Sequence, residues 1–520
     1  MESILQLLQD VRGYASPANI GLALGSLIAC AAIYAFYGCI YNIYFHPLSH
    51  IPGPFLSRAS GIPYTLRLRN GSIAPWIQKL HRTYGDAVRV TPTEVSFISG
   101  ETAWQDIYGF RIGKHAKTGA YSKDLQWFPK PHNGSYSLVG ADEETHSRMR
   151  KTMSHAFSDK ALREQEYLVQ ELIDQLIQRL HEKVEEKNPV LDITRWYNYT
   201  TFDIVTDLTF GESLHCLRDR GTNPWIDMVF SAPKAIGTLA TRRKYPIFDY
   251  YDRFTAFFSD NSKTVSQRIA FFKLVTTKVE ERIAKQTDRP DFMTHILKNN
   301  GIGEKALTRP EIVANSALLL VAGSETTATT LSGATWLMLK NPEVYKKVVA
   351  EVRSRFTSQD QITMEEVNKL EYLIVMFQEA FRYYPPVPTG FPRIVPPGGD
   401  RISGFYIPEG TSVYVSQHAT NHSDRNFADP EAFVPERWLK NPDAKYKNDK
   451  QSVVNTFSFG PRACLGKNLA YAEMRLIMAK VLFNFDLELQ PESYDWMSRM
   501  KVFTLWDKPP LMVSLRPVKR

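Results

Sequence analysis

Cysteine is scarce in this sequence, with four residues in a chain of 520. They lie far apart, at Cys30, Cys39, Cys216 and Cys464. Thiols so few and so scattered exclude a disulfide framework and a cysteine-rich zinc site. Internal repeats are also absent, and the 28 glycines and 31 prolines follow no period, which excludes collagen-like and low-complexity chains. We therefore expect a reducing compartment, in which any cysteine chemistry depends on a single thiol.

Acidic residues are slightly outnumbered, since 63 Lys and Arg stand against 55 Asp and Glu and leave a net charge of +8. No dense run of Lys and Arg is interleaved with aromatic residues, so we expect no nucleic-acid partner. An ordinary surface with a small basic excess, contact with anionic lipid and contact with an acidic protein stay open. With 43% hydrophobic and 23% charged residues, the composition is that of a globular chain.

Charged residues are absent altogether between Gly13 and Ser57. Residues 20–43 are mostly Leu, Ile, Ala and Tyr, and about 20 apolar residues suffice for a helix to cross a membrane. The chain start carries acidic residues and no basic cluster, which favours an uncleaved anchor over a cleaved signal peptide. Basic residues follow the segment, so the positive-inside rule places the rest of the chain in the cytosol. The first of these are Arg58, Arg67, Arg69 and Lys79.

The sequence predicts three parts. Residues 1–45 form the N-terminal segment with its anchor, and residues 46–60 form a stiff hinge, because the run Pro52-Gly53-Pro54 cannot continue a helix. Residues 61–520 form one large domain.

Within that domain, residues 161–184 repeat apolar side chains at helical spacing, and a capped apolar run from Thr308 to Leu339 predicts a helix through the centre. Short alternations in residues 393–415 predict small strands, and a further helix is expected over about 465–482. The fold class is mainly α with a minor β portion.

The most informative segment is FSFGPRACLG, which runs from Phe457 to Gly466. Its glycines permit a tight loop around Cys464 that a flat ligand can approach closely. The helix expected directly after it favours thiolate over thiol through its dipole and its N–H groups, and Arg462 adds positive charge. A single stabilised thiolate on a rigid loop is typical of an axial ligand to haem iron. The alternative is an ordinary buried cysteine in a glycine-rich turn.

The spacing of Phe457, Gly460, Arg462, Cys464 and Gly466 resembles the haem-binding signature of the cytochrome P-450 family at every fixed position. The resemblance covers essentially the whole chain and implies the cytochrome P-450 fold, preceded by a single N-terminal transmembrane helix. It also implies haem b, with the Cys464 thiolate as the axial ligand of the iron. Three further segments resemble family motifs in the family's order: Ala322–Thr327 (AGSETT), Glu379–Arg382 (EAFR) and Pro435–Trp438 (PERW).

The resemblance gives two of these segments a role. Glu379 and Arg382 lie three residues apart on one helix face and can pair, and the resemblance implies that Arg437 joins them in a buried network that fixes the loop with Cys464. The alternative is a surface pair of little energetic value. Glu325 and Thr326 are then the catalytic residues, an acid and a hydroxyl that relay protons to bound oxygen. Gly323 before them predicts a local distortion of the helix. The alternative is a threonine bonded to its own helix and a glutamate in a salt bridge.

The two propionates of a haem need cations. The resemblance assigns Arg462, Arg150 and Arg393 to this purpose, and His146 less firmly, because many relatives have tryptophan there. Phe457, the first fixed position of the signature, is assigned to cofactor binding with them. We expect Arg148 beside them to be a solvated arginine.

The resemblance also implies partners. Electrons would come from the membrane-bound NADPH-cytochrome P-450 reductase, with cytochrome b5 as an optional donor, since no Gly-rich dinucleotide fingerprint indicates a fused reductase. Lys467, Arg475 and Lys480 form either a docking patch or a solvated helix face. The expected substrate is a lipophilic small molecule of fungal secondary metabolism, of polyketide or terpenoid type. In relatives a few variable stretches contact the substrate, and here these would be residues 116–140, 315–319, 387–391 and 501–505. Their aromatic residues Trp127, Phe128, Phe391 and Phe503 indicate an apolar pocket.

The leading hypothesis is a monooxygenase in the endoplasmic reticulum membrane, with a single span and its catalytic domain in the cytosol. One alternative has the same fold but rearranges or dehydrates its substrate without dioxygen, and would not need Glu325 and Thr326. A second is a non-catalytic haem-binding membrane protein. A third is an anchored helical scaffold without haem.

Overall fold

The computed structural model describes residues 17–113, 119–128, 133–186, 189–220, 234, 236–257, 262–285 and 287–519, and most of this part of the chain is helical. The helices are α2 (Pro17–Ile40), α3 (Phe55–Ala59), α4 (Ile62–Asn70), α5 (Ile73–Tyr84), α6 (Gly100–Tyr108), α7 (Glu143–Met153), α8 (Asp159–Glu185), α9 (Ile193–Phe210), α11 (Pro246–Phe257), α12 (Ser262–Ala284), α13 (Phe292–Lys298), α14 (Arg309–Lys340), α15 (Pro342–Arg355), α16 (Met364–Val367), α17 (Glu371–Tyr383), α18 (Gln417–Asn421) and α19 (Lys467–Asn484).

The strands form small sheets, as expected for a minor β portion. The first sheet has the order β1-β2-β8-β5-β3, in which β2 and β8 are parallel and the other neighbours antiparallel. The others have the orders β4-β12-β9, β6-β7 and β10-β11. The strands are β1 (Ala87–Thr91), β2 (Glu94–Phe97), β3 (Ser122–Lys123), β4 (Val190–Asp192), β5 (Arg393–Ile394), β6 (Asp400–Ile402), β7 (Phe405–Ile407), β8 (Ser412–Val415), β9 (Phe485–Leu489), β10 (Lys501–Val502), β11 (Trp506–Asp507) and β12 (Met512–Pro517).

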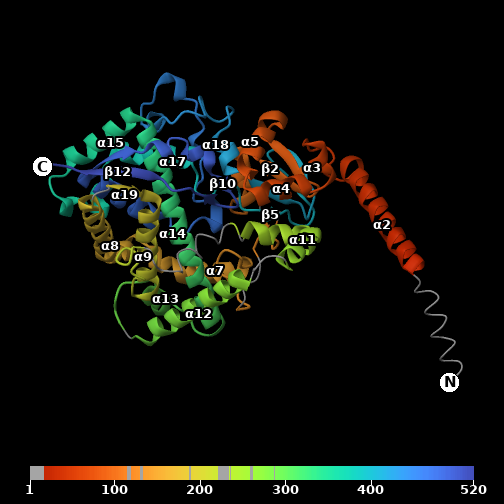
Figure 1. The fold of residues 1–520 in the computed structure, drawn as a ribbon, viewed down its shortest axis with the longest axis horizontal. Coiled ribbons are helices and arrows are strands. Elements are labelled where there is room, and N and C mark those ends of the chain that lie inside the picture. The colour runs from red at the N-terminus through yellow and green to blue at the C-terminus, as the bar shows by residue number, and fades with distance from the viewer. Residues whose placement is uncertain are drawn as a thin grey trace.

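The long helix α14 runs through the centre of the molecule and packs against α9, α17 and α19 (Figure 1). Its bounds agree with the predicted run, and Thr308 and Glu311 form the expected capping box at its start. The distortion expected at Gly323 is absent, since α14 is continuous there. A Cβ at Gly323 would lie 2.8 Å from Val205 Cγ2 on α9. The glycine therefore permits the close approach of two helices.

The other predicted helices agree less closely in their ends. Helix α8 covers the amphipathic run, and the Ser158 side chain caps it by accepting from the Ala161 N–H. Helix α19 begins two residues later than expected, with Gly466 as its N-cap. Cys464 thus lies in the loop before the helix, and the prediction that it stands at the helix terminus itself was wrong.

The N-terminal helix α2 projects away from the body of the molecule and continues as a π-helical turn over Tyr41–Phe45 (Figure 1). The stretch Gly21–Phe45 is long and apolar enough to cross a membrane. After it, Leu48 and Ile51 are buried, and the Arg89 N–H on β1 donates to the Pro52 carbonyl over 2.8 Å. The segment predicted as a hinge is therefore packed onto the first sheet, while the limits of the three parts stay a prediction.

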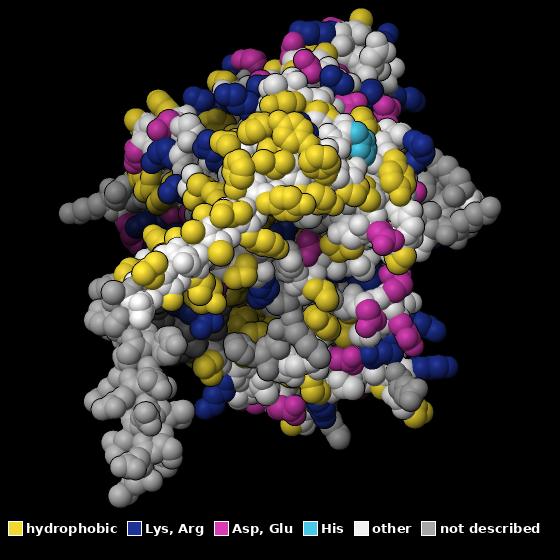
Figure 2. Space-filling model, turned by 90° about the vertical axis from the view of Figure 1, so that its right-hand side faces the viewer, with side chains coloured by type: hydrophobic (Ala, Val, Ile, Leu, Met, Phe, Trp, Pro, Cys, Tyr) yellow, Lys and Arg dark blue, Asp and Glu magenta, His cyan; other side chains and the backbone are white. Residues whose placement is uncertain are grey.

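Exposed apolar side chains gather on the side of the body from which α2 emerges (Figure 2). We call this surface the apolar face. Its members come from the end of the anchor, α3, α4 and α11, and they include Phe45, Phe55, Leu56, Ile62, Leu66, Ile247, Tyr250, Tyr251 and Phe254.

Candidate active site

The loop that carries Cys464 folds back on itself. Gly460 has a φ of +72°, and a Cβ there would lie 2.0 Å from the Tyr108 carbonyl oxygen, so glycine is required. The Cys464 N–H donates to the Phe457 carbonyl over 2.8 Å, which closes the loop. Cys464 is exposed by surface area.

The surroundings of the thiol act in opposite directions. Burial raises the pKa of Cys464, although the Gly466 backbone N–H and the charges of Arg150 and Lys467 each act to lower that pKa. In the chain alone, desolvation of the sulfur outweighs the nearby donors and cations, and the predicted thiolate ligation of iron stays a prediction.

Glu379 and Arg382 on α17 meet Arg437, which lies 58 positions after Glu379 in the sequence. Arg382 makes two hydrogen bonds to the Glu379 carboxylate, of 2.7 and 2.8 Å, and Arg437 Nε donates to Glu379 Oε1 over 3.2 Å. All three are fully buried. Trp438 Nε1 donates to the same carboxylate, and Asp449, which the sequence did not suggest, pairs with Arg437. The surface-pair alternative is thus excluded by geometry.

An aromatic cluster joins this network to the cysteine loop. The ring of Phe381 on α17 lies 5.4 Å from that of Phe457 and 5.6 Å from that of Tyr471 on α19, measured between centroids. The Phe457 ring is thus packed between helices, where it holds the loop in place.

Basic side chains converge beside the loop. Arg150 Nη1 donates to the Ala463 carbonyl over 2.6 Å, and Arg462 donates to the Ala141 carbonyl over 2.9 Å and to Glu143 over 3.1 Å. Arg148, in contrast, pairs with Glu311. It lies outside the cluster, although as a partly buried ion pair and not as the solvated arginine we expected.

Arg393 and His146 belong to the same cluster. Arg393 is buried, and its Nη1 has no hydrogen-bond partner among the described residues. Burial lowers the pKa of Arg393 to about 10. Burial and the charges of Arg462 and Arg150 lower the pKa of His146 to about 3, so this imidazole is neutral at physiological pH.

Sequence reasoning missed a fifth member, Lys123. It lies opposite Arg393 in the antiparallel pair of β3 and β5. Burial, then the charges of Arg393 and Arg462, lower the pKa of Lys123 well below its usual range. Nothing near Lys123 in the sequence signals this place, because the strand pairing that creates it spans some 270 residues.

The acid and the hydroxyl of α14 point to different surroundings. Thr326 Oγ1 donates to the Ala322 carbonyl over 2.6 Å, while Glu325 is buried and pairs with Lys508. These are the contacts of the alternative that the sequence left open. Ala322 is exposed and Thr326 is half-buried, although α14 crosses the centre of the molecule. This face of the helix is therefore accessible to solvent inside the molecule.

Comparison with known proteins identifies the family. A family model described as Cytochrome P450 matches residues 62–515. The chain belongs to the cytochrome P450 family. It is 46% identical over 521 residues to the cytochrome P450 monooxygenase lcsI of Purpureocillium lilacinum, covering 100% of this chain and 99% of that protein. It is 47% identical over 498 residues to the cytochrome P450 monooxygenase traB of Penicillium crustosum, covering 95% and 97%. The expected family, fold class and monooxygenase class are thereby confirmed.

The cofactor of cytochromes P450 is haem with a cysteine thiolate on the iron, and the residues of this P450 fit it. Cys464 is exposed on a closed loop. Among the described residues, the carboxylate that pairs with the basic cluster is that of Glu143, which binds Arg462. The buried Arg393 Nη1 has no hydrogen-bond acceptor among them. Buried cations need counter-charge, and the carboxylates of a haem would supply it.

The aromatic residues predicted to contact substrate separate into two pairs. Phe128 and Phe391 are half-buried, and their ring centroids lie 4.7 and 5.8 Å from Lys123 Nζ, next to the basic cluster. Trp127 and Phe503 are buried. The predicted contact stretch 116–140 lies partly outside the described residues, at 116–118 and 129–132.

The basic side chains predicted as a docking patch do not form one. Lys480 is buried and pairs with Asp174, and Arg475 is half-buried and donates to Asn368. Only Lys467 of the three is exposed. Tertiary packing therefore fits neither interpretation for Lys480, which is buried and so neither free to dock nor solvated.

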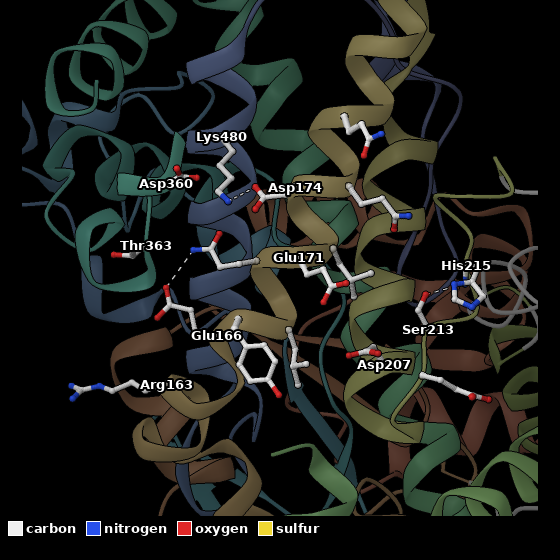
Figure 3. A pocket seen from close by; sticks show the side chains of 17 residues that line it. Arg163, Glu166, Glu171, Asp174, Asp207, Ser213, His215, Asp360, Thr363 and Lys480 are labelled. Carbon is white, nitrogen blue, oxygen red and sulfur yellow. Dashed lines mark hydrogen bonds and ion pairs between the residues drawn. The ribbon is translucent and has the colours of Figure 1, made fainter. Parts of the chain in front are cut away.

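A separate hollow of about 1130 Å³ lies between α8, the end of α9 and the segment before α16 (Figure 3). Six of its 17 lining residues are acidic. Three of these acids are already paired: Asp174 with Lys480, Asp207 with Arg289 and Glu212 with Lys278. It contains none of the residues predicted for the active site.

Proposed function

We propose that this P450 is a membrane-anchored monooxygenase that inserts one atom of dioxygen into a lipophilic small molecule and reduces the other atom to water. The observation that carries the proposal is the exposed Cys464 beside a partly buried basic cluster, in which the buried Arg393 has a nitrogen without a partner among the described residues. This arrangement suits an anionic, flat ligand with one soft metal position.

In the proposed mechanism, Cys464 would hold the iron and the basic cluster would hold the propionates. Bound haem supplies the activation of dioxygen. Arg393, Arg462 and Arg150 neutralise the carboxylates, assisted by Lys123, while neutral His146 can only donate or accept a single hydrogen bond per nitrogen. The network of Glu379, Arg382 and Arg437 acts indirectly, by fixing the chain around the cysteine loop.

The protons that the reaction consumes are supplied by Glu325 through the hydroxyl of Thr326. In the resting arrangement that hydroxyl donates to Ala322, so relay requires it to turn away from its helix carbonyl. A torsion of the hydroxyl frees its O–H, and the proton would reach it from Glu325 through water, because the side-chain contacts of Glu325 are Lys508 and Thr329.

The substrate is proposed to be a lipophilic secondary metabolite of polyketide or terpenoid type, bound next to Phe128 and Phe391. The electrons would come from NADPH through the membrane-bound P450 reductase, with cytochrome b5 as an optional donor. We place the protein in the endoplasmic reticulum membrane with its catalytic domain in the cytosol. The span Gly21–Phe45, the basic residues after it and the adjoining apolar face support this location.

The decisive test is a dithionite-reduced, CO-bound difference spectrum of membranes that contain the full chain, recorded beside Cys464→Ser. We expect the red-shifted Soret band of a thiolate-bound haem in the first sample and its loss in the second. A folded, haem-containing protein without that band would contradict ligation by Cys464. Haem binding without NADPH consumption in the presence of reductase would instead favour a non-catalytic haem protein or a dioxygen-independent isomerase or dehydratase.

A further inference from the structure

The acid of α14 is held by a lysine from the opposite end of the chain. Lys508 directly follows β11, and its ammonium group contacts Glu325 Oε1 and donates to Thr329 Oγ1 over 2.7 Å. The two acceptors are four residues apart and therefore lie on one face of α14. Both the Lys508 and the Glu325 side chains are almost wholly removed from solvent, with exposures of 4% and 3%.

The carboxylate is only half satisfied. Its second oxygen, Oε2, is buried and has no hydrogen-bond partner among the described residues. The other ionisable groups that act on it are Asp507 next to Lys508 and Tyr384 at the end of α17. The Tyr384 hydroxyl is likewise buried without a partner. Neither Asp507 nor Tyr384 can carry positive charge. Lys508 is thus the cation that neutralises the Glu325 carboxylate.

This balance decides how Glu325 holds a proton. Burial raises the pKa of Glu325, and the charge and hydrogen bond of Lys508 act against that rise. An acid can supply protons repeatedly only if it also loses and regains them near the working pH. Without a neighbouring cation, a buried carboxyl group stays protonated and cannot pass protons on.

We propose that Lys508 is a positioning residue that keeps Glu325 on its buried face of α14 and sets the pH range in which it supplies protons. This inference rests on the proposed monooxygenase function. In each delivery an O–H bond of the Glu325 carboxylic acid breaks and the proton passes to the hydroxyl of Thr326 or to a water. Lys508 stabilises the carboxylate left behind, which regains its proton from solvent.

The sign of the pH effect follows. Proton supply falls as the pH rises through the pKa of Glu325, because only the acid form donates. Loss of Lys508 raises that pKa further, so the falling limb of the pH profile moves to higher pH, by roughly 1 to 3 units. Lys508→Arg retains the charge and keeps the limb near its original position.

The test uses the full-length holoenzyme with P450 reductase and compares wild type, Lys508→Met and Lys508→Arg. NADPH oxidation without added substrate is followed against pH, and infrared spectra of the same proteins, at rest, report the carbonyl band of a protonated carboxylic acid. We expect that band to persist to higher pH in Lys508→Met and to vanish in the double variant Lys508→Met/Glu325→Gln. An unchanged band and an unchanged limb in a folded Lys508→Met would overturn the proposal.

Lys480→Met is the matched control, because Lys480 is also a buried lysine paired with an acid, Asp174, but has no contact with Glu325. It should lower stability without moving the limb. If Lys508→Met does not fold, wild type against Glu325→Gln still decides. A Glu325-dependent protonated-carboxyl band that persists to the highest pH at which the protein stays folded would show that Lys508 does not stabilise its carboxylate. The infrared readout needs no turnover, so failure of the monooxygenase function and failure of this inference are separable.

Discussion

At the scale of single residues, the basic cluster is the feature most difficult to explain without a ligand. Buried cations of like sign destabilise one another, and each also loses its hydration. Here Arg393, Lys123 and His146 all have lowered pKa values because of burial and neighbouring positive charge. A fold keeps such an arrangement when an anion completes it, which is why we assign it to the propionates.

Arg393 provides the corresponding prediction. Arg393→Gln removes a charge-assisted hydrogen bond, worth about 1.5–3 kcal/mol, so we expect haem to dissociate roughly 10- to 100-fold faster. Transfer of haem to excess apomyoglobin measures this rate. Arg401→Gln, at an exposed arginine on β6, should leave it unchanged. Equal rates for Arg393→Gln and wild type would remove Arg393 from the haem site.

At the scale of secondary-structure elements, a buried histidine ties α5 to the first sheet. His81 Nδ1 lies 2.8 Å from the Gly85 carbonyl, and its Nε2 lies 2.8 Å from Ser96 Oγ on β2. A carbonyl only accepts, so Nδ1 carries the proton and Nε2 accepts from the serine. This join needs the neutral ring, and burial lowers the pKa of His81 to about 4.

The pH dependence follows from linkage. Between pH 6.5 and about 4 the unfolded state binds a proton at His81 that the folded state does not, so stability falls as the pH falls through this window. At pH 5 the loss is about 2 kcal/mol. Urea unfolding at pH 7 and pH 5 measures the free energy of unfolding at each pH. We expect the difference between the two values to be smaller in His81→Gln than in wild type. A variant with the same acid sensitivity as wild type would contradict it.

At the scale of the whole molecule, the anchor and the apolar face lie on the same side (Figure 2). Large exposed apolar surfaces on soluble parts of a protein usually meet a partner or a membrane. With α2 in the membrane, as we propose, this side would lie next to the bilayer, and the apolar face would enter the lipid headgroup region and keep the body at a fixed tilt.

We therefore expect a chain that lacks residues 1–45 to retain vesicle binding. Leu56 on α3 and Phe254 on α11 are each 67% exposed. Replacing both with glutamate in the truncated chain should weaken binding by at least about tenfold, because each buried apolar side chain contributes about 1.5–3 kcal/mol. Co-sedimentation with phospholipid vesicles measures the change. Ile302→Glu, at a residue 95% exposed but outside the apolar face, is the control.

How far sequence reasoning reached can be judged from particular elements. The bounds of α8 and α14 followed from local periodicity and capping, because helical hydrogen bonds and caps join residues a few positions apart. The loop around Cys464 followed from glycine, whose permitted φ is also a local property. The membrane span followed from composition over one continuous segment.

Other features depended on contacts between distant segments. Lys123 joins Arg393 only because β3 pairs with β5, and Lys508 reaches Glu325 across 183 positions. The same holds for the burial of Lys480, which removed it from the predicted docking patch.

By itself, then, the sequence determined the helices, the cysteine loop, the long apolar N-terminal segment and the family. Each of these depends on neighbouring residues or on a fixed spacing. Only the tertiary structure decided which charges are buried together, which acid is balanced by which cation, and where the apolar surface lies. Burial and pairing are properties of the packed chain, and the free energy of a charge depends on what surrounds it in space.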